Sequence, residues 1–416
     1  MFPALSVALS ALSANSTAID VVGNNLANLN TTGYKDTSVS FQDMMSQSLG
    51  VGANAAQTGM GVGQVQTLTN YTQGNLQTTN GPTDAAIQGT GFFVVQSPST
   101  NQTLYTRDGS FQLDASGNLV TGGGQFVQGW PAVNGTANPN GPVENLSVPL
   151  GTVDPATATT TMSINVNLNS QSASGAAFSA PVQVIDSQGQ SHTLTVNFTN
   201  TGVNAWTYDV QVPAADLPAQ ASTSLTTGTM TFDGNGNLLT PASTTDPQTI
   251  SIPNLADGAS AMSIAWSLYG SGGAATITQN AQASGLGNAT QNGVGAGQIS
   301  GVSLQKGGLL VASYSNGKQV TIGQLAMASI PNPESLSSVG DNNLQASAAT
   351  GTISVGGANT GGRGQIVAGQ LESSTVDMAT EFTNLLAYER SYQAASKVIT
   401  TSDQLLQQTI NLVPNS

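Results

Sequence analysis

The residues of this chain that could do chemistry are few. His192 is the only histidine among 416 residues, and the chain contains no cysteine. A zinc site or a serine-histidine triad needs further ligands or partners around an imidazole, and the sequence has neither a Cys nor a second His to supply them. We therefore predict that His192 is an exposed hairpin residue with no metal and no catalytic role. The lack of cysteine also excludes disulfide frameworks and thiol catalysis.

An acidic loop is the second candidate site. Asp233, Asn235 and Asn237 alternate as ligands do at the start of a calcium-binding loop. Leu238 replaces the required glycine, however, and Thr244 stands where the bidentate glutamate belongs. The segment is therefore predicted to form a tight turn that binds no calcium.

Glycine-rich and aromatic segments complete the candidates. Residues 59–63 and 356–364 lack both the Lys-Ser/Thr ending of a phosphate loop and the strand-to-helix setting of a dinucleotide site. Trp130, Trp206 and Trp266 could stack on sugar rings, but each lies at or near a predicted strand, where aromatic rings usually fill the core. We expect no cofactor and no enzymatic activity.

Composition narrows the class of partner. The net charge is −14 with only seven Lys and Arg, which argues against nucleic acid, because phosphate backbones are bound by clustered basic residues. Charged residues make up 7% and hydrophobic residues 38% of the chain, so it should fold rather than remain disordered. No uninterrupted apolar run approaches the roughly 20 residues that span a bilayer, so no membrane insertion is expected.

The elements that would organise such a chain lie at its two ends. Apolar residues recur there with heptad spacing, which places one narrow apolar seam on a helix and requires a partner helix to cover it. The N-terminal series is Leu5, Leu12, Ile19 and Leu26, with Val22 between them. The C-terminal series is Leu371, Met378, Leu385, Tyr392, Ile399 and Leu406, with Phe382 and Ile410 beside it. Paired terminal helices predict a subunit that assembles with copies of itself.

The limits of these helices can also be predicted. Residues 1–18 have no basic start, and serines interrupt the apolar block, so we interpret them as mature helix rather than a cleaved signal peptide. The turn-forming residues that follow predict an end near Asn30. At the other end, Ser374 with Asp377 resembles a capping box that starts the second helix.

Strand signals dominate the middle of the chain. GFFVVQ (91–96) is a short apolar strand, and residues 105–121 predict a hairpin around a turn at 114–117. The segment GSFQLDASGNLVT, which begins at Gly109, recurs in outline as GTMTFDGNGNLLT from Gly228. Asp, Asn and Gly in both segments favour the backbone of tight turns.

These signals predict a mainly β, multidomain chain with α-helical termini that pair like a coiled coil. The proposed parts are a terminal helical domain (1–30 with 370–416), an extended irregular connector (31–70), a split β-domain (71–144 with 286–369) and an inserted β-barrel or sandwich (145–285). The nesting brings both termini together. An intramolecular helical hairpin buried in one subunit is the less favoured explanation of the heptads, and it is compatible with assembly.

Several spaced motifs resemble those of the bacterial flagellar rod and hook proteins. The front motif is NNLANLNTTGYK, which comprises Asn24, Asn25, Leu26, Asn28, Thr32, Gly33, Tyr34 and Lys35. The back motif starts at LESSTVDMATEF, and the interior contributes GTGFFVV and YTRDGSFQLDASGNLVTGGGQFVQGW. The inserted segments VIDSQGQSHTLTVNF and AWTYDV resemble the hook branch of that family. Ala394-Ala395-Ser396 departs from the commoner Ala-Asn-Ala or Ala-Asn-Ser. This departure affects helix packing and leaves the resemblance intact.

The resemblance implies a structural subunit of the hook, a curved hollow tube that acts as a universal joint between motor and filament. It implies that the protein polymerises with itself, contacts the distal rod, the hook cap, the hook-filament junction proteins and the hook-length control protein, and leaves the cell through the flagellar type III export apparatus. The expected location is the extracellular hook. Two alternatives stay open: a distal-rod protein of the same family, which would form straight tubes, and a secreted β-rich adhesin or glycan-binding protein.

Overall fold

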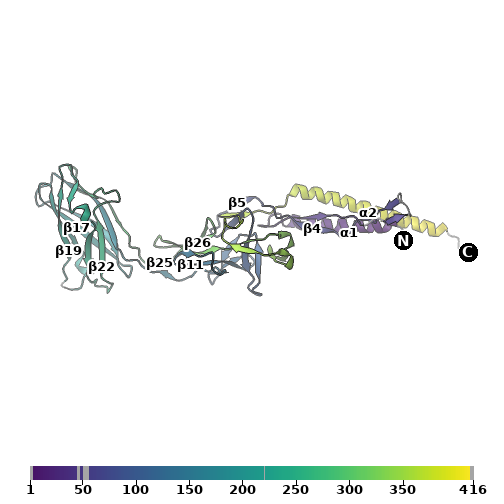
Figure 1. Cartoon of the computed structure of the whole chain (residues 1–416), viewed down its shortest axis with the longest axis horizontal. Coiled ribbons are helices and arrows are strands. Elements are labelled where there is room, and N and C mark those ends of the chain that lie inside the picture. The colour runs from purple at the N-terminus through teal and green to yellow at the C-terminus, as the bar shows by residue number, and fades with distance from the viewer. Residues whose placement is uncertain (1–2, 45–46, 50–55, 220, 413–416) are drawn as a thin grey trace. The chain divides into compact units, whose positions relative to one another are not determined.

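The computed structural model describes residues 3–44, 47–49, 56–219 and 221–412 (Figure 1). Two compact units divide the chain. The terminal unit comprises Met1–Leu150, Val302–Ala312 and Val320–Ser416, and the inserted unit comprises Gly151–Gly301 with Ser313–Gln319. The predicted mainly β fold with a helix at each end of the chain is confirmed.

Two α-helices belong to the described residues of the terminal unit, which also contains the short 3-10 helices η3 (Pro333–Ser335) and η4 (Ala348–Thr350). α1 (Pro3–Ala27) and α2 (Met378–Leu412) pack against each other and run antiparallel, so that the N- and C-termini lie at the same end of the pair (Figure 1). α1 ends slightly before the predicted Asn30, and residues 28–30 form a turn. α1 is long and apolar enough to cross a membrane. Core helices of soluble proteins and signal sequences meet the same criteria of length and composition.

The start of α2 differs from the prediction in two ways. Asp377 is the capping residue, because its Oδ1 atom accepts a hydrogen bond of 2.8 Å from the backbone N–H of Thr380. Ser374 precedes the helix, and its hydroxyl accepts from Val376 N–H. Leu371, predicted as the first residue of the C-terminal seam, lies in the short strand β33 (Gln370–Glu372). Its heptad spacing is accidental, since strand β33 pairs with β5 (Leu76–Thr78) and holds that part of the chain extended.

Residues 31–70 contain paired strands where the sequence predicts an irregular connector. β1 (Thr37–Ser40) pairs antiparallel with β4 (Gln66–Thr69), and β2 (Gln47–Leu49) pairs with β3 (Ala56–Thr58). The ribbon lies against α1, because the backbone N–H of Val62 donates to the Ser10 hydroxyl at 3.2 Å. The side chains are mostly polar, so pairing of backbone groups rather than burial of apolar residues orders this ribbon.

The β-structure of the terminal unit is built around β7 (Phe92–Gln96), the strand predicted from GFFVVQ. β7 pairs with β8 (Thr103–Thr106), β11 (Phe126–Val133) and β28 (Met327–Ser329). Strands from before and after the insertion thus share one sheet. The unit's other strands are β6 Ala85–Gln88, β9 Phe111–Leu113, β10 Leu119–Thr121, β12 Thr136–Ala137, β13 Glu144–Asn145, β29 Ser337–Gly340, β30 Asn343–Gln345, β31 Ser354–Gly356 and β32 Gln365–Ala368. Strands β25 Gly297–Gln305, β26 Leu309–Tyr314 and β27 Gln319–Leu325 contain residues of both units.

The predicted turn repeat is confirmed. β9 and β10 pair through a turn in which Asp114 Oδ1 accepts from the N–H of Asn118 at 2.8 Å. The equivalent Asp233 Oδ1 accepts from the N–H of Asn237 at 2.7 Å, between β19 (Ser224–Phe232) and β20 (Leu238–Thr240). Because the carboxylate of Asp233 bonds its own loop, this segment has the structure of a tight turn.

Two five-stranded sheets form the inserted unit around one core. One contains β16 Ala177–Ile185, β17 Ser191–Gly202, β18 Ala205–Gln211, β19 and β20, and the other contains β15 Thr161–Asn169, β21 Gln248–Ile252, β22 Met262–Ser267, β23 Ile277–Asn280 and β24 Gly285–Gln291. The short β14 (Val153–Asp154) pairs with β25. Trp206 and Trp266 are fully buried in this core, and Trp130 is buried in the terminal unit, so the predicted core role of the tryptophans is confirmed.

The prediction that His192 is exposed is wrong, although the residue does lie in the hairpin formed by β16 and β17. The residue is 5% exposed and lies among aspartates. In β17 it occupies the same face as Leu194, Val196 and Phe198, all of which are buried, since alternate residues of a strand point to one side. The imidazole therefore points inward at the end of the core.

Candidate assembly surface and the joint at its base

The buried apolar side chains of the two packed helices are mostly small. Ala8, Ala14, Ala18 and Val22 of α1 are buried, and Ala395 of α2 is buried with them on the helix pair. The predicted seam residues Leu5, Leu12, Ile19 and Leu26 are only half-buried, as are Leu385, Ile399 and Leu406 of α2. Alanines let two helices approach closely, so the buried line follows the small residues and the larger ones flank it.

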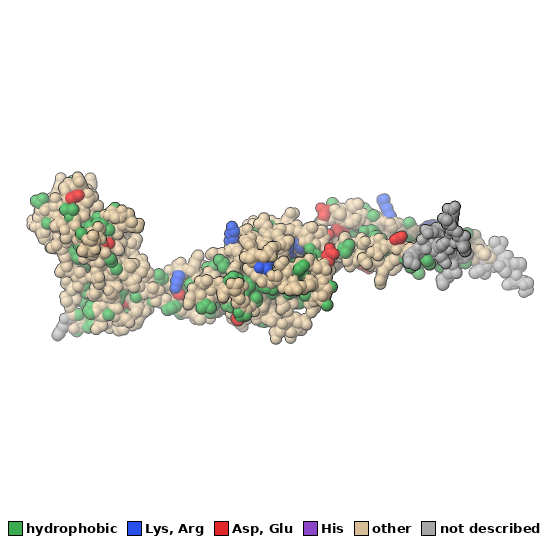
Figure 2. Space-filling view, viewed as in Figure 1, with side chains coloured by type: hydrophobic (Ala, Val, Ile, Leu, Met, Phe, Trp, Pro, Cys, Tyr) green, Lys and Arg blue, Asp and Glu red, His purple; other side chains and the backbone are tan. Residues whose placement is uncertain are grey.

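A second apolar stripe on α2 is uncovered. Met378, Phe382 and Leu386 recur every four residues on one face, and each is half-exposed or more. Tyr392, Val398 and Leu405 are also exposed on α2, and Leu9 on α1. Figure 2 shows that the charged side chains on the visible face are few and scattered among uncharged polar ones. Apolar side chains exposed along one helix mark a surface that another molecule covers.

The structure places the predicted assembly residues in three groups. Met378, Phe382 and Tyr392 are exposed, the seam residues named above are half-buried, and Val22 is buried. Val22, expected to face a neighbour, is 3% exposed and is therefore buried within the subunit. It follows the line of small residues one turn after Ala18, which places it on the same buried side of the helix. The side chain of Ile410 lies outside the described residues.

The motif at the end of α1 forms a joint with the start of α2. The Asn25 amide is 1% exposed and uses all of its hydrogen-bonding capacity. Its Nδ2 donates to the Thr37 carbonyl at 2.8 Å and to Glu381 Oε1 at 3.0 Å. Its Oδ1 accepts from the N–H of Thr37 at 3.1 Å and from the Tyr34 hydroxyl at 3.2 Å. One side chain thus ties α1, the ribbon and α2 together.

Gly33 and its neighbours extend the joint into the sheet. The φ of Gly33 is +69°, and a Cβ there would lie 2.7 Å from the backbone carbon of Arg107. Its N–H donates to the Glu372 carbonyl at 2.7 Å, and the adjacent Thr32 carbonyl accepts from Asn342 Nδ2 at 2.7 Å. Only glycine combines this backbone conformation with so close an approach.

A buried ion triad completes the joint. Lys35 Nζ lies 2.6 Å from Glu372 Oε1, and Arg107 Nη1 lies 3.1 Å from Glu372 Oε2. The Glu372 side chain is fully buried, and those of its two partners are 6% exposed. Gly74 N–H also donates to Glu372 Oε1, and Arg107 Nη2 donates to the Gly89 carbonyl. Burial lowers the pKa of Lys35 and of Arg107, and the charge of Glu372 opposes that change.

Glu381 has fewer hydrogen-bond and ion-pair partners than Glu372. Its Oε1 accepts from Asn25, but its buried Oε2 has no hydrogen-bond partner in the described residues. Burial raises the pKa of Glu381, the hydrogen bond from Asn25 opposes this, and the charges of Asp36 and Asp377 add to it. Sequence reasoning missed Arg107, Glu372 and Glu381. The sequence did hold one clue to these residues. Charged residues are rare in a chain with only seven Lys and Arg, so a charged residue inside a motif is a candidate for an ion pair.

Comparison with known proteins decides the family. Family models match residues 5–35 (flagella basal body rod protein), 86–172 (flagellar hook protein FlgE/F/G D1 domain), 154–294 (flagellar basal body protein FlaE D2 domain) and 367–412 (flagellar basal body rod FlgEFG protein C-terminal). The flagellar hook protein FlgE of Treponema pallidum is 32% identical over 99% of this chain and 100% of its own length. The chain belongs to the flagellar hook protein family.

Further relatives agree. The flagellar hook proteins FlgE of Escherichia coli and of Salmonella typhimurium are each 34% identical over 98% of this chain, and cover 100% and 99% of their own lengths. The solved structure of Helicobacter pylori flagellar hook protein FlgE2 aligns with 71% of this chain and 100% of its own at 15% identity and a TM-score of 0.48, so the assignment depends on the sequence relatives instead. This chain is a structural subunit of the flagellar hook, in a family not known for enzymes.

Proposed function

We propose that the antiparallel helix pair is the element through which the chain polymerises. The observation that supports this is the uncovered stripe of Met378, Phe382 and Leu386 on a helix whose other side already contacts α1. An intramolecular hairpin explains the Ala8 to Val22 line but leaves this stripe in water. A tube grows by one surface of a subunit binding a different surface of the next, and the stripe suits such a heterologous contact.

The joint would then transmit torque from the helices to the β-structure. Asn25, Gly33 and the Lys35–Glu372–Arg107 triad connect the helix ends to the sheet through buried hydrogen bonds and ion pairs. Buried charge pairs resist displacement because breaking one leaves a charge without a partner. We expect this connection to be stiff, and bending to arise where neighbouring subunits meet through uncharged polar surfaces.

We propose that each predicted domain forms a different layer of the tube. Residues 1–30 with 370–416 form the inner helical layer, 31–70 the connector, 71–144 with 286–369 the split β-domain and 145–285 the inserted domain. We propose that, besides the contacts between subunits, the part of the connector that follows the stiff contacts of Gly33, Lys35 and Thr37 and the junctions near 145 and 285 adjust during bending. Few fixed ion pairs on the outer surfaces allow polar contacts to exchange with water at low cost.

Further expectations concern partners and export. We propose contacts with the distal rod, hook cap, hook-filament junction and hook-length control proteins, and export by the flagellar type III apparatus without removal of a signal peptide. The helix α1 then packs against helices rather than lipid, with no membrane insertion and no nucleic acid. No catalytic role is proposed.

The decisive experiment disrupts the stripe with charge. Phe382→Asp combined with Leu386→Asp should abolish tube formation, since each carboxylate would be buried in the contact between subunits at a cost of several kcal/mol. Val203→Asp is the matched control, because Val203 is 94% exposed in the inserted unit. Sedimentation and electron microscopy measure assembly, and circular dichroism checks that helix content is kept. A doubly substituted chain that forms tubes at the wild-type rate would exclude the stripe as a contact.

The same micrographs test the alternatives. The hook assignment predicts curved tubes, and it would be contradicted by the straight tubes expected of a distal-rod protein or by the absence of tubes expected of an adhesin. The full-length hook relatives favour the hook assignment.

A further inference from the structure

His192 and the aspartates around it form a cluster that hook assembly does not require. The cluster lies entirely in the inserted unit, at one end of its core. Its members come from three separate loops: the turn between β16 and β17 carries Asp186, the short helix η1 (Ala214–Asp216) carries Asp216, and the loop between β21 and β22 carries Asp257. His192 is the second residue of β17.

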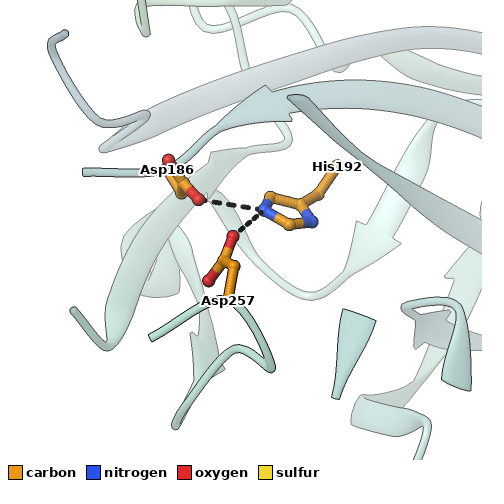
Figure 3. Close-up of side chains that lie close together, drawn as sticks. All are labelled: Asp186, His192 and Asp257. Carbon is orange, nitrogen blue, oxygen red and sulfur yellow. Dashed lines mark hydrogen bonds and ion pairs between the residues drawn. The ribbon is translucent and has the colours of Figure 1, made fainter. Parts of the chain in front are cut away.

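Two carboxylates converge on one imidazole nitrogen. His192 Nε2 lies 3.1 Å from Asp186 Oδ2 and 3.4 Å from Asp257 Oδ2, and Figure 3 shows the three side chains pointing toward one another. An imidazole nitrogen carries at most one proton and forms a hydrogen bond here with Asp186. Two negative oxygens therefore share a partner that can satisfy only one of them fully.

Each carboxylate is fixed by its other oxygen. Asp186 Oδ1 accepts from the N–H groups of Gln188 at 2.8 Å and Gln190 at 2.9 Å. Asp257 Oδ1 accepts from the N–H of Ala259 at 2.9 Å. Both Oδ2 atoms are thereby directed toward His192 without the need for a ligand. Such outer hydrogen bonds are how proteins orient metal ligands in advance.

The other side of the imidazole supplies an independent observation. His192 is 5% exposed, and its buried Nδ1 forms an ion pair with Asp216, whose Oδ2 lies 3.1 Å away, without the geometry of a hydrogen bond in the described part of the chain. When a histidine binds a metal through Nε2, the ring proton resides on Nδ1, and a carboxylate commonly accepts it. Asp216 stands in that position.

We propose that Asp186, His192 and Asp257 bind one divalent transition-metal cation, zinc in the first instance, with Asp216 as the positioning partner of the imidazole. One nitrogen and two carboxylate oxygens are a donor set that zinc accepts, and water would fill the open position. Zinc bonds of about 2.0–2.2 Å place neighbouring tetrahedral ligand atoms about 3.3 Å apart, close to the two distances observed.

Binding to the doubly protonated ring would exchange one cation for one proton, whereas a ring with a single proton would only move it to Nδ1. Nε2 gives its electron pair to the metal, the ring keeps a single proton on Nδ1, and any second ring proton passes to solvent. Asp186 is fully buried, but the side chain of Asp257 is 31% exposed, so the cation would reach the cluster from the Asp257 side. The effect would be to clamp three loops of the inserted unit, independently of whether the terminal helices polymerise.

The test uses the full chain and zinc alone. Because His192 is the only histidine, nitrogen NMR of protein labelled with ¹⁵N-histidine reports a single ring. We expect calorimetry to show one zinc per chain, a shift of the Nε2 resonance typical of metal binding, and an increase in the melting temperature of the chain. His192→Gln should weaken binding at least about 100-fold, and Asp257→Asn and Asp216→Asn about 10-fold or more.

Controls separate the cluster from other carboxylates. Asp233→Asn changes a turn aspartate of the same unit and should leave zinc affinity unchanged. If His192→Gln does not fold, the exposed Asp257 still provides a variant that keeps the core intact. The proposal is overturned if wild-type protein binds no zinc at millimolar concentration, if Asp257→Asn binds it as tightly as wild type, or if Nε2 does not shift when zinc binds.

Discussion

The inserted unit and the helix pair solve the burial of apolar residues in opposite ways. The inserted unit closes two sheets over one core that contains Trp206, Trp266 and Phe198, all fully buried. The helix pair buries a line of alanines and Val22 and leaves Phe382 and Leu386 in water. A unit with a closed core needs no other subunit to bury its apolar residues, whereas the helix pair leaves apolar residues exposed that, in the assembly proposed above, a neighbouring subunit would cover.

The distribution of polar groups follows the same division. At the base of the helices, buried charges connect segments far apart in the chain, as Lys35 and Glu372 do. Most of the core of the inserted unit is apolar, and among its described residues the buried Asp and His side chains, Asp186 and His192, lie together at one end. The terminal unit therefore depends on a few polar contacts to fix the helices, and the inserted unit on the volume of its core.

Deleting residues 1–25 should have the largest effect on assembly. A small effect would contradict the contrast between the two units. Without α1, the buried Ala395 and the half-buried Leu385, Ile399 and Leu406 of α2 lose their partner and α2 should unfold in the monomer, so we expect no tubes. Hydrogen exchange of the inserted unit should be unchanged, since its core contains no residue of α1. Electron microscopy and hydrogen-exchange mass spectrometry measure the two outcomes. A truncated chain that polymerises normally would show that α1 is dispensable.

Glu372→Gln should have the next largest effect. The substitution keeps the shape of the side chain and removes its charge, which leaves the ammonium of Lys35 and the guanidinium of Arg107 buried without a counter-charge. We expect the free energy of unfolding of the terminal unit to fall by about 3–5 kcal/mol. Glu144→Gln, at an exposed position of the same unit, is the matched control. Denaturant unfolding monitored by hydrogen exchange measures the free energy of unfolding of both variants. A loss below about 1 kcal/mol for Glu372→Gln would mean that the triad does not fix the joint.

Local patterns predicted much of this fold. Heptad spacing found both helices, and the Asp-x-x-Gly-Asn turns found two hairpins, because each signal lies within a few residues of chain. The ribbon of β1 and β4 was missed, since Val39 and Leu68 are the only apolar residues of those strands and give no alternation. A heptad register also failed at Leu371, where strand pairing with residues far along the chain overrides the spacing.

The polar sites were harder to predict for a physical reason. Glu372 meets Lys35 and Arg107 across hundreds of residues, so no local pattern relates them. His192 was different: its alternation with Leu194, Val196 and Phe198 placed it on the core face, and that signal was available. The aspartates that surround it come from three loops, and only the fold brings them together.

Glu381→Gln should have the smallest effect and gives a pH test of the joint. The pKa of Glu381 is raised in the folded chain, so the folded state holds the proton more tightly than the unfolded state. This contribution to stability is complete below the ordinary value of 4.5 and is lost as pH rises through the raised value. At neutral pH the buried carboxylate, with Oε2 unpartnered, therefore destabilises the helix contact.

A glutamine removes that charge and can still accept the hydrogen bond from Asn25. The variant should be more stable than wild type by about 1 kcal/mol at pH 7, and the difference should disappear as the pH falls below about 4. Glu389→Gln, on an exposed face of α2, should show no such pH dependence. Thermal unfolding of the terminal unit across this pH range measures the difference. A variant less stable than wild type at pH 7 would mean that the charge of Glu381 holds the helices together, and that the joint, like the triad beside it, depends on ionic contacts throughout.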